Sequence, residues 1–343
     1  MPYDPAEAVP VAKTGLHVTR LGLGGASIGG LFGAVEDAAA EALIEHAWER
    51  GVRYFDTAPL YGYGASERRF GRALAHMPRD MYVLSTKVGR LVRREDQIPP
   101  GADIDRQSIG GRDDAFFVRT EPLRVVFDFT ADGVRRSIGE SLERLGLDRI
   151  DIAFIHDPDE HWEAAIGQAY PALARLREEG VVGAIGAGMN QASMLARFAR
   201  EADVDAFLVA GRYTLLDHAA LDELLPRCVE RGIAVVIGGV VNSGVLVDPR
   251  AGSHFDYRPA APAILERARR LAEVCGRHDV PLHHAAIQFP LAHPAVVSVL
   301  AGVRTPGHLD EYPAAMRRRI PAALWEELRA ERLIPAGAPV PSG

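Results

Sequence analysis

The stretch VRYFDTAPLYGYGASE, residues 52–67, is the part of the chain from which the fold is best read. It opens with a short apolar run, typical of a strand, that ends in Asp56 just before turn residues begin. Two other runs repeat this pattern: MYVLSTKVGR reaches Lys87, and DIAFIHDPD reaches His156. Three strand-like runs that each reach one ionisable residue predict chemistry at the ends of strands.

Tyr61, in the turn after the first run, completes a set of groups suited to moving a proton at a carbonyl or alcohol oxygen. A free phenol is a poor acid or base at neutral pH, and an adjacent ammonium lowers its pKa. We expect Lys87 to be that ammonium and Asp56 to keep it charged and aimed. His156 is then free to hydrogen-bond a substrate oxygen, so the set supplies half of a hydride-transfer reaction.

Lysine is scarce in this chain. Of the 39 lysine and arginine residues, only Lys13 and Lys87 are lysine, so arginine serves wherever a positive charge is enough. Arginine cannot replace a compact ammonium whose pKa can be tuned. The alternative, that Lys87 is an ordinary surface lysine, is disfavoured because it closes a run that reads as a buried strand.

Strand-like and helix-like segments alternate along the chain. A hairpin is expected at residues 9–23, leading into strands at 20–25, 52–56, 82–87, 149–156, 181–186, 205–210, 233–238 and 296–300. The expected helices are 37–50, 66–76, 131–145, 161–179, 192–201, 221–231, 262–277, 284–292, 306–316 and 322–332. Eight such units predict one α/β domain over residues 1–343, a (β/α)8 TIM barrel with an N-terminal β-hairpin and an extra C-terminal helix.

Two segments do not fit this alternation. Residues 88–129 mix Gly, Pro, Asp and Arg with a short apolar run, and we expect a long irregular loop over the barrel mouth that helps to select substrate. A surface excursion with its own small apolar patch is the alternative. The Pro- and Gly-rich tail from Pro335 is expected to be loose.

Composition narrows the class of protein. The 343 residues are 48% hydrophobic and 25% charged, and the net charge of −7 argues against a nucleic-acid or anionic membrane surface. No secretory signal or apolar run of about 20 residues is visible, which predicts a cytoplasmic protein, monomeric or weakly homo-oligomeric, with a small-molecule partner. Cys228, Cys275, His283 and His284 lack metal-ligand spacing, so we expect no metal site.

The three strand-end segments, DTAPLYGYG with those that contain Lys87 and His156, resemble the active-site segments of the aldo-keto reductase superfamily. The likeness covers nearly the whole chain. The run RSIGESLERLGLDRIDIAFIHDPD, residues 136–159, is similar to the subgroup of D-threo-aldose 1-dehydrogenases, with L-fucose, L-galactose and pyridoxal 4-dehydrogenases among its relatives. The resemblance implies that Asp56, Tyr61, Lys87 and His156 form the catalytic tetrad, with Tyr61 as the general acid and base.

The same resemblance implies a nicotinamide cofactor bound at the later strand ends. No G-x-G-x-x-G fingerprint is complete, so a Rossmann fold is disfavoured. Asn190 aligns with the position that contacts the nicotinamide carboxamide, whereas Ala210 stands where the family often has glutamine. The remaining expected contacts lie after the seventh and eighth strands: Gly239, Ser243, Gly244, Leu246, Gly302, Arg304, Thr305, His308, Glu311 and Tyr312.

NAD is the expected cofactor, in preference to NADP. Family members that prefer NADPH hold its 2′-phosphate with lysine and arginine at places that are Gly302 and His308 here, and Arg304 is the basic residue that remains. The activity implied is oxidation of the C1 hydroxyl of an aldose, or of pyridoxal, to a lactone. The alternatives are an NADPH-dependent aldehyde or ketone reductase and a non-catalytic, cofactor-binding regulatory subunit.

Overall fold

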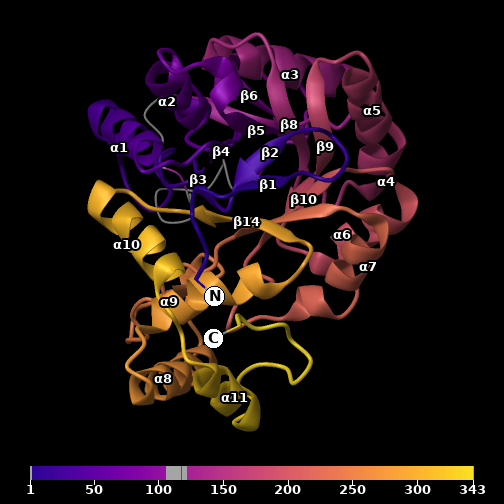
Figure 1. Cartoon of the computed structure of the whole chain (residues 1–343). Coiled ribbons are helices and arrows are strands. Elements are labelled where there is room, and N and C mark those ends of the chain that lie inside the picture. The colour runs from indigo at the N-terminus through magenta and orange to yellow at the C-terminus, as the bar shows by residue number, and fades with distance from the viewer. Residues whose placement is uncertain (1, 106–116, 118–121, 343) are drawn as a thin grey trace.

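The computed structural model describes residues 2–105, 117 and 122–342. Within this part of the chain, eight parallel strands close into a barrel, and helices surround it (Figure 1). The predicted (β/α)8 architecture is confirmed. In chain order the barrel strands are β3 Leu21–Gly24, β4 Tyr54–Asp56, β5 Val83–Val88, β8 Ile150–His156, β9 Val182–Met189, β10 Ala206–Ala210, β11 Ala234–Gly238 and β14 Val296–Ala301.

The helices lie close to their predicted positions. The predicted helix at 161–179 is a helix with a π-helical turn at its centre, and the remaining differences are of a few residues at the ends. Capping explains both ends of the helix at residues 131–145. The Thr130 hydroxyl accepts a hydrogen bond from the Gly133 amide at its start, and Gly146 ends it with φ 65°. The helices are α1 Asp37–Glu49, α2 Ala65–Leu74, α3 Ala131–Leu145, α4 Trp162–Ala164, α5 Tyr170–Glu178, α6 Ala192–Glu201, α7 Leu224–Arg231, α8 Pro262–Arg277, α9 Leu282–Gln288, α10 Pro306–Arg317 and α11 Ala322–Ala330.

Alternation along the strands decides which side chains enter the barrel. Tyr54, Val83 and Phe154 belong to one buried cluster, to which the N-terminal hairpin β1 Ala8–Pro10 and β2 His17–Thr19 also contributes. Side chains two residues further along a strand point to the same face. Asp56, Lys87 and His156 therefore lie on the inner face too, at the C-terminal ends of their strands.

The segment after β5 is more regular than expected. Strand β6 Arg90–Arg94 pairs antiparallel with β7 Leu123–Phe127, so the prediction of an irregular loop over 88–129 is wrong at both of its ends. Val92 and Val125 lie opposite each other in this pairing, and both belong to an apolar cluster with Leu60 and Leu123. The middle of the segment lies outside the described residues.

The C-terminal tail is packed, contrary to the prediction that it is loose. Ala338 is buried and its carbonyl accepts a hydrogen bond from Arg329 Nη2 at 2.7 Å. A tail can be held this way without forming a helix or strand, which a reading of its Pro and Gly content misses.

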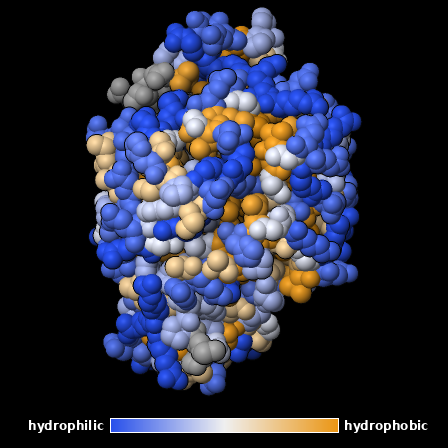
Figure 2. Space-filling view, turned by 45° about the horizontal axis from the view of Figure 1, so that its top comes forward, coloured by the Kyte–Doolittle hydropathy of each residue, from blue (hydrophilic) through white to orange (hydrophobic). Residues whose placement is uncertain are grey.

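Hydrophilic residues cover most of the face in Figure 2, with apolar residues gathered near its centre. Among the described residues, the large apolar side chains that are well exposed are Phe32, Met81, Val229 and Val247, which come from separate segments. No helix of the described chain has both the length and the apolar character needed to cross a membrane.

Candidate active site

The four residues predicted to act together come from three neighbouring barrel strands and one turn. Asp56 ends β4, Lys87 lies one residue from the end of β5, and His156 ends β8. The pairing of β4 with β5 and of β5 with β8 is parallel, which brings these ends to one mouth of the barrel. Tyr61 lies in the turn between β4 and α2 and reaches the same place.

Lys87 and Asp56 form a buried ion pair at the base of this mouth. Lys87 Nζ donates to Asp56 Oδ2 and to the Thr57 carbonyl, both at 2.8 Å, and the two ionic side chains are 1% and 3% exposed. Ser85 Oγ donates to the other Asp56 oxygen at 2.6 Å. A buried pair stabilises a fold only when its remaining polar atoms also find partners, as they do here. Ser85 was missed in the sequence, although it lies two residues before Lys87 and hence on the same strand face.

Tyr61 packs among the other members of the set. Lys87 Nζ lies 4.7 Å from the centre of the Tyr61 ring, and the His156 ring meets it edge-on at 5.8 Å. Phe117 stacks on it at 5.6 Å. The ammonium therefore faces the ring as a cation–π contact.

The pKa of Tyr61 is raised, whereas the sequence predicted that it would be lowered. Burial raises it well above its ordinary value, the charges of Asp56 and Asp157 raise it further, and Arg90 offsets part of this. The expected lowering of this pKa is therefore not found, because burial and the two carboxylates outweigh the nearby positive charge. Tyr61 is thus a protonated phenol at neutral pH.

His156 is a neutral imidazole in this environment. Burial lowers its pKa well below the ordinary value, and the charges of Arg90 and Lys87 lower it further. In the described part of the chain, its buried Nδ1 has no hydrogen-bond partner. A neutral ring with a proton on Nε2 donates to a substrate oxygen without changing charge. This agrees with the predicted role.

A charge cluster that the sequence did not indicate lies beside His156. Arg90, from β6, donates to Asp105 Oδ2 at 3.0 Å and to Asp157 Oδ2 at 2.9 Å. The same guanidinium donates to the His156 carbonyl at 3.3 Å. The β6–β7 hairpin is therefore tied to the end of β8, and through it to the catalytic mouth.

Asn190 and the turn after β11 lie together, as the cofactor prediction requires. Asn190 Nδ2 donates to the Ala210 carbonyl at 3.1 Å, and its side chain also hydrogen-bonds Tyr257. Gly239 and Gly244 have φ values of 64° and 100°, conformations that glycine adopts without strain in tight turns. The Leu246 side chain is fully buried in the hydrophobic core, and the predicted cofactor contact of this residue stays a prediction.

The turn after β11 continues into a second hairpin, β12 His254–Phe255 with β13 Arg258–Pro259, which the sequence reading missed. Arg212 holds its tip through a bidentate pair with Asp256, at 2.9 and 2.8 Å. Phe32, from the loop after β3, contacts the rings of His254 and Tyr257, with centroids 5.7 and 6.0 Å apart. The hairpin thus contacts the loop after β3, which β14 separates from β11 in the barrel.

The predicted contacts after β14 divide into exposed and buried residues. Gly302, Arg304, Thr305 and His308 are exposed. Thr305 caps α10, its hydroxyl accepting from the His308 amide at 3.3 Å, and Arg304 Nη2 donates to the Leu31 carbonyl at 2.6 Å. A Cβ added to Gly302 would meet only Ser27 Oγ, at 3.9 Å, so the surface beside this glycine is open.

Tyr312 is buried, and its ring does not line the surface beside Gly302. It hydrogen-bonds the Gly302 backbone, and burial raises its pKa to about 12. The Tyr312 side chain is therefore held within the fold, and its predicted contact with the cofactor stays a prediction.

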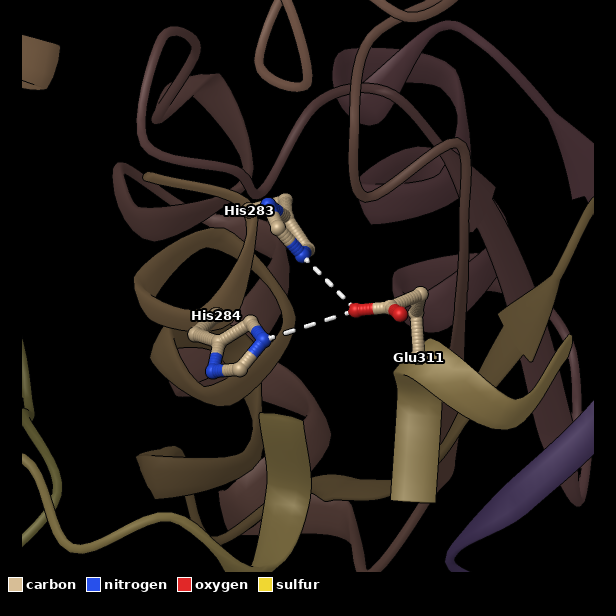
Figure 3. Close-up of side chains that lie close together, drawn as sticks. All are labelled: His283, His284 and Glu311. Atoms are coloured by element: carbon tan, nitrogen blue, oxygen red, sulfur yellow. Dashed lines mark hydrogen bonds and ion pairs between the residues drawn. The ribbon is translucent and has the colours of Figure 1, made fainter. Parts of the chain in front are cut away.

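Glu311 meets two histidines that were predicted to lack ligand-type neighbours (Figure 3). Its Oε2 lies 3.4 Å from His283 Nε2 and 3.8 Å from His284 Nε2, and among the described residues this is the one group able to offer three metal ligands. The positive end of α9 opposes a cation here, and so does Arg318, which adds to burial and to His283 in lowering the pKa of His284. We interpret the contact as a polar link between α9 and α10.

Known proteins with similar sequences cover almost the whole chain. Residues 20–331 match the profile of the Aldo/keto reductase family. The chain is 45% identical over 328 residues to D-threo-aldose 1-dehydrogenase from a Pseudomonas species, covering 94% of this chain and 97% of that one. It is 41% identical over 343 residues to pyridoxal 4-dehydrogenase from Microbacterium luteolum, covering 96% and 98%.

Solved structures support the fold. The holo form of aldo-keto reductase AKR11C1 from Bacillus halodurans superposes with a TM-score of 0.73 at 24% identity, covering 97% of each chain. Glycerol dehydrogenase AKR11B4 from Gluconobacter oxydans gives 0.75 at 20% identity, covering 98% of each. At these identities the likeness concerns the barrel alone.

Proposed function

The chain belongs to the aldo/keto reductase family and is an oxidoreductase, and from this premise we propose that it oxidises the C1 hydroxyl of a cyclic aldose to a lactone. The substrates that we propose are L-fucose or another threo-configured aldose, or pyridoxal in its hemiacetal form. Two relatives above 40% identity, named for an aldose and for pyridoxal, support this range. Both compounds present a ring carbon that carries one hydroxyl and one hydrogen.

The residues at the mouth fit the nicotinamide cofactor that this family uses. Asn190 offers an amide near the ends of β9 and β10, and the open backbone at Gly244 and Gly302 leaves room for close approach of a large ligand. When bound, the oxidised nicotinamide accepts a hydride. We propose NAD for this role, because Gly302 and His308 occupy the places of the basic residues that hold a 2′-phosphate.

The single observation that carries the mechanism is the convergence of Tyr61, His156 and the Lys87–Asp56 pair at one barrel mouth. His156, neutral and buried, donates from Nε2 to the reacting oxygen and holds it near the phenol. Tyr61 takes the proton of the C1 hydroxyl when its own oxygen is deprotonated. Loss of this proton and of the C1 hydride leaves the lactone carbonyl.

The raised pKa of Tyr61 sets the pH dependence of each direction. Below its pKa the phenol is protonated, so it is a general acid for reduction and cannot act as base for oxidation. As pH rises toward that pKa, the phenolate fraction grows. We expect the oxidation rate to increase with pH into the alkaline range while the reduction rate falls.

A substrate panel with purified protein tests the proposal. The absorbance of the reduced cofactor is followed with L-fucose, further aldoses, pyridoxal and simple alcohols, each with NAD and NADP at several pH values. We expect turnover with at least one aldose or pyridoxal and a lactone product. Inactivity on all of these, with efficient reduction of simple aldehydes by NADPH, would support the alternative function of an aldehyde or ketone reductase. A phenol that is protonated at neutral pH, as Tyr61 is here, suits the general acid of such a reductase.

A further inference from the structure

Asp157 places a carboxylate at the catalytic mouth that the proposed proton transfer does not use. Its Oδ2 lies 3.5 Å from His156 Nε2, the atom that donates to the reacting oxygen in our mechanism. Its side chain is 24% exposed, whereas that of His156 is 6% exposed. Asp157 is thus the more accessible of the two groups.

Asp157 shares its cationic partner with a second carboxylate. The buried Arg90 guanidinium serves both Asp105 and Asp157, whose side chains are 4% and 24% exposed. Lys87 pairs with Asp56 instead. A carboxylate accepts several hydrogen bonds, and in the described chain both polar contacts of Asp157 use Oδ2. Oδ1 is therefore able to accept from a ligand.

The backbone fixes this carboxylate in place. Asp157 has φ 37°, a left-handed conformation that aspartate and asparagine adopt more readily than most residues. Its amide donates to the Gly188 carbonyl at 3.1 Å, and Arg90 restrains the side chain. A restrained acceptor beside His156 is suited to recognising a hydroxyl group in one orientation.

We propose that Asp157 determines substrate specificity by accepting a hydrogen bond from the hydroxyl on the carbon next to the reacting carbon. This rests on the proposed function, and it narrows the substrates to aldoses, because in the pyridoxal hemiacetal the carbon next to the reacting carbon carries no hydroxyl. His156 contacts the reacting oxygen in our mechanism, and the Asp157 carboxylate lies beside it, with Oδ2 3.5 Å from His156 Nε2. The hydroxyl on the carbon next to the reacting carbon is the substrate donor that can reach this carboxylate while the reacting oxygen contacts His156.

The expected consequence is discrimination against substrates that lack this hydroxyl. A site built to hydrogen-bond a substrate hydroxyl rejects the analogue without it, because its polar group is left unpaired. We therefore expect the wild-type kcat/KM for an aldose to exceed that for its 2-deoxy counterpart by about a hundredfold.

Asp157→Asn tests the proposal with little change of shape. Asparagine tolerates the positive φ and keeps an oxygen for Arg90, but loses the charge. We expect the aldose to 2-deoxyaldose ratio of kcat/KM to fall to about ten or less, chiefly through the KM of the aldose. Asp105→Asn, which alters the other carboxylate on Arg90, is the matched control and should leave the ratio unchanged.

Other outcomes separate the possible roles. An equal loss of kcat with both substrates and a shifted pH profile would show that Asp157 only positions His156, and a ratio unchanged in Asp157→Asn would overturn the proposal. If no aldose is oxidised, the proposed function fails, and calorimetry with a 1,5-anhydroalditol and its 2-deoxy form tests Asp157 by itself. Equal binding of the two compounds by the wild type would then overturn the inference.

Discussion

The two sides of the barrel mouth are built differently. On the side of β4, β5 and β8, the functional groups are buried and each is held by neighbours, as in the Lys87–Asp56 pair with bonds of 2.8 Å. On the side of β11 and β14, the candidate contacts lie in glycine-containing turns and at exposed positions such as Arg304 and His308. The side of β4, β5 and β8 holds the proposed catalytic groups in fixed positions, whereas the side of β11 and β14 offers an exposed surface to a ligand.

This difference indicates which substitutions should change turnover and stability the most. A buried ionic group that loses its partner leaves an uncompensated charge, which costs about 3–5 kcal/mol. An exposed side chain that contacts a bound phosphate affects only the affinity for that ligand. Changes on the first side should therefore alter turnover and stability, whereas those on the second should alter cofactor choice.

The largest effect is expected for Tyr61→Phe. The ring and its contacts with Lys87 and Phe117 remain, but the oxygen that exchanges the proton is lost. Steady-state assays should show turnover reduced by on the order of 10²-fold or more, and titration should show cofactor binding unchanged. Tyr82→Phe, at a buried tyrosine beside the opposite end of β5, is the control. Near-normal turnover of Tyr61→Phe would show that another group moves the proton.

A smaller but broader effect is expected for Lys87→Arg. The positive charge is kept, but a planar guanidinium does not fit a site where a buried ammonium has two partners at 2.8 Å. Overpacking should lower the free energy of unfolding by about 1–3 kcal/mol, measured in urea, and turnover should fall at least tenfold. Lys13→Arg changes the other lysine, which is exposed, and should alter neither quantity. Unimpaired turnover in Lys87→Arg would mean that any buried cation suffices there.

The side of β4, β5 and β8 could be predicted well from the sequence, because the patterns that indicate it are local. Eight repeats of strand and helix predict the barrel, and an apolar run that reaches one ionisable residue marks Asp56, Lys87 and His156. Each such residue could be placed without knowing what it contacts. Parallel strands then bring the three ends together by geometry.

The features that were missed depend on contacts between distant residues. Arg90 and Asp157 are 67 positions apart, and their pairing requires the β6–β7 hairpin, which no turn motif in the described chain announces. The raised pKa of Tyr61 likewise depends on burial and on the charges of Asp56 and Asp157. Leu246 and Tyr312 were predicted to contact the cofactor, whereas long-range packing buries both.

The smallest effect concerns the second side of the mouth, where we expect NAD to bind more tightly than NADP. A 2′-phosphate gains most from charge-assisted bonds, and each missing contact is worth roughly 1.5–3 kcal/mol. Arg304 is exposed, but its Nη2 already donates to the Leu31 carbonyl at 2.6 Å, so it gives limited compensation. Fluorescence titration with both reduced cofactors should show at least tenfold weaker binding of NADPH, and Arg304→Ala should change that ratio less than about threefold. His308→Arg, which restores a basic residue at an exposed position, should narrow the preference. Tighter binding of NADPH than of NADH, lost in Arg304→Ala, would instead show that this one arginine has taken over the role of the absent pair.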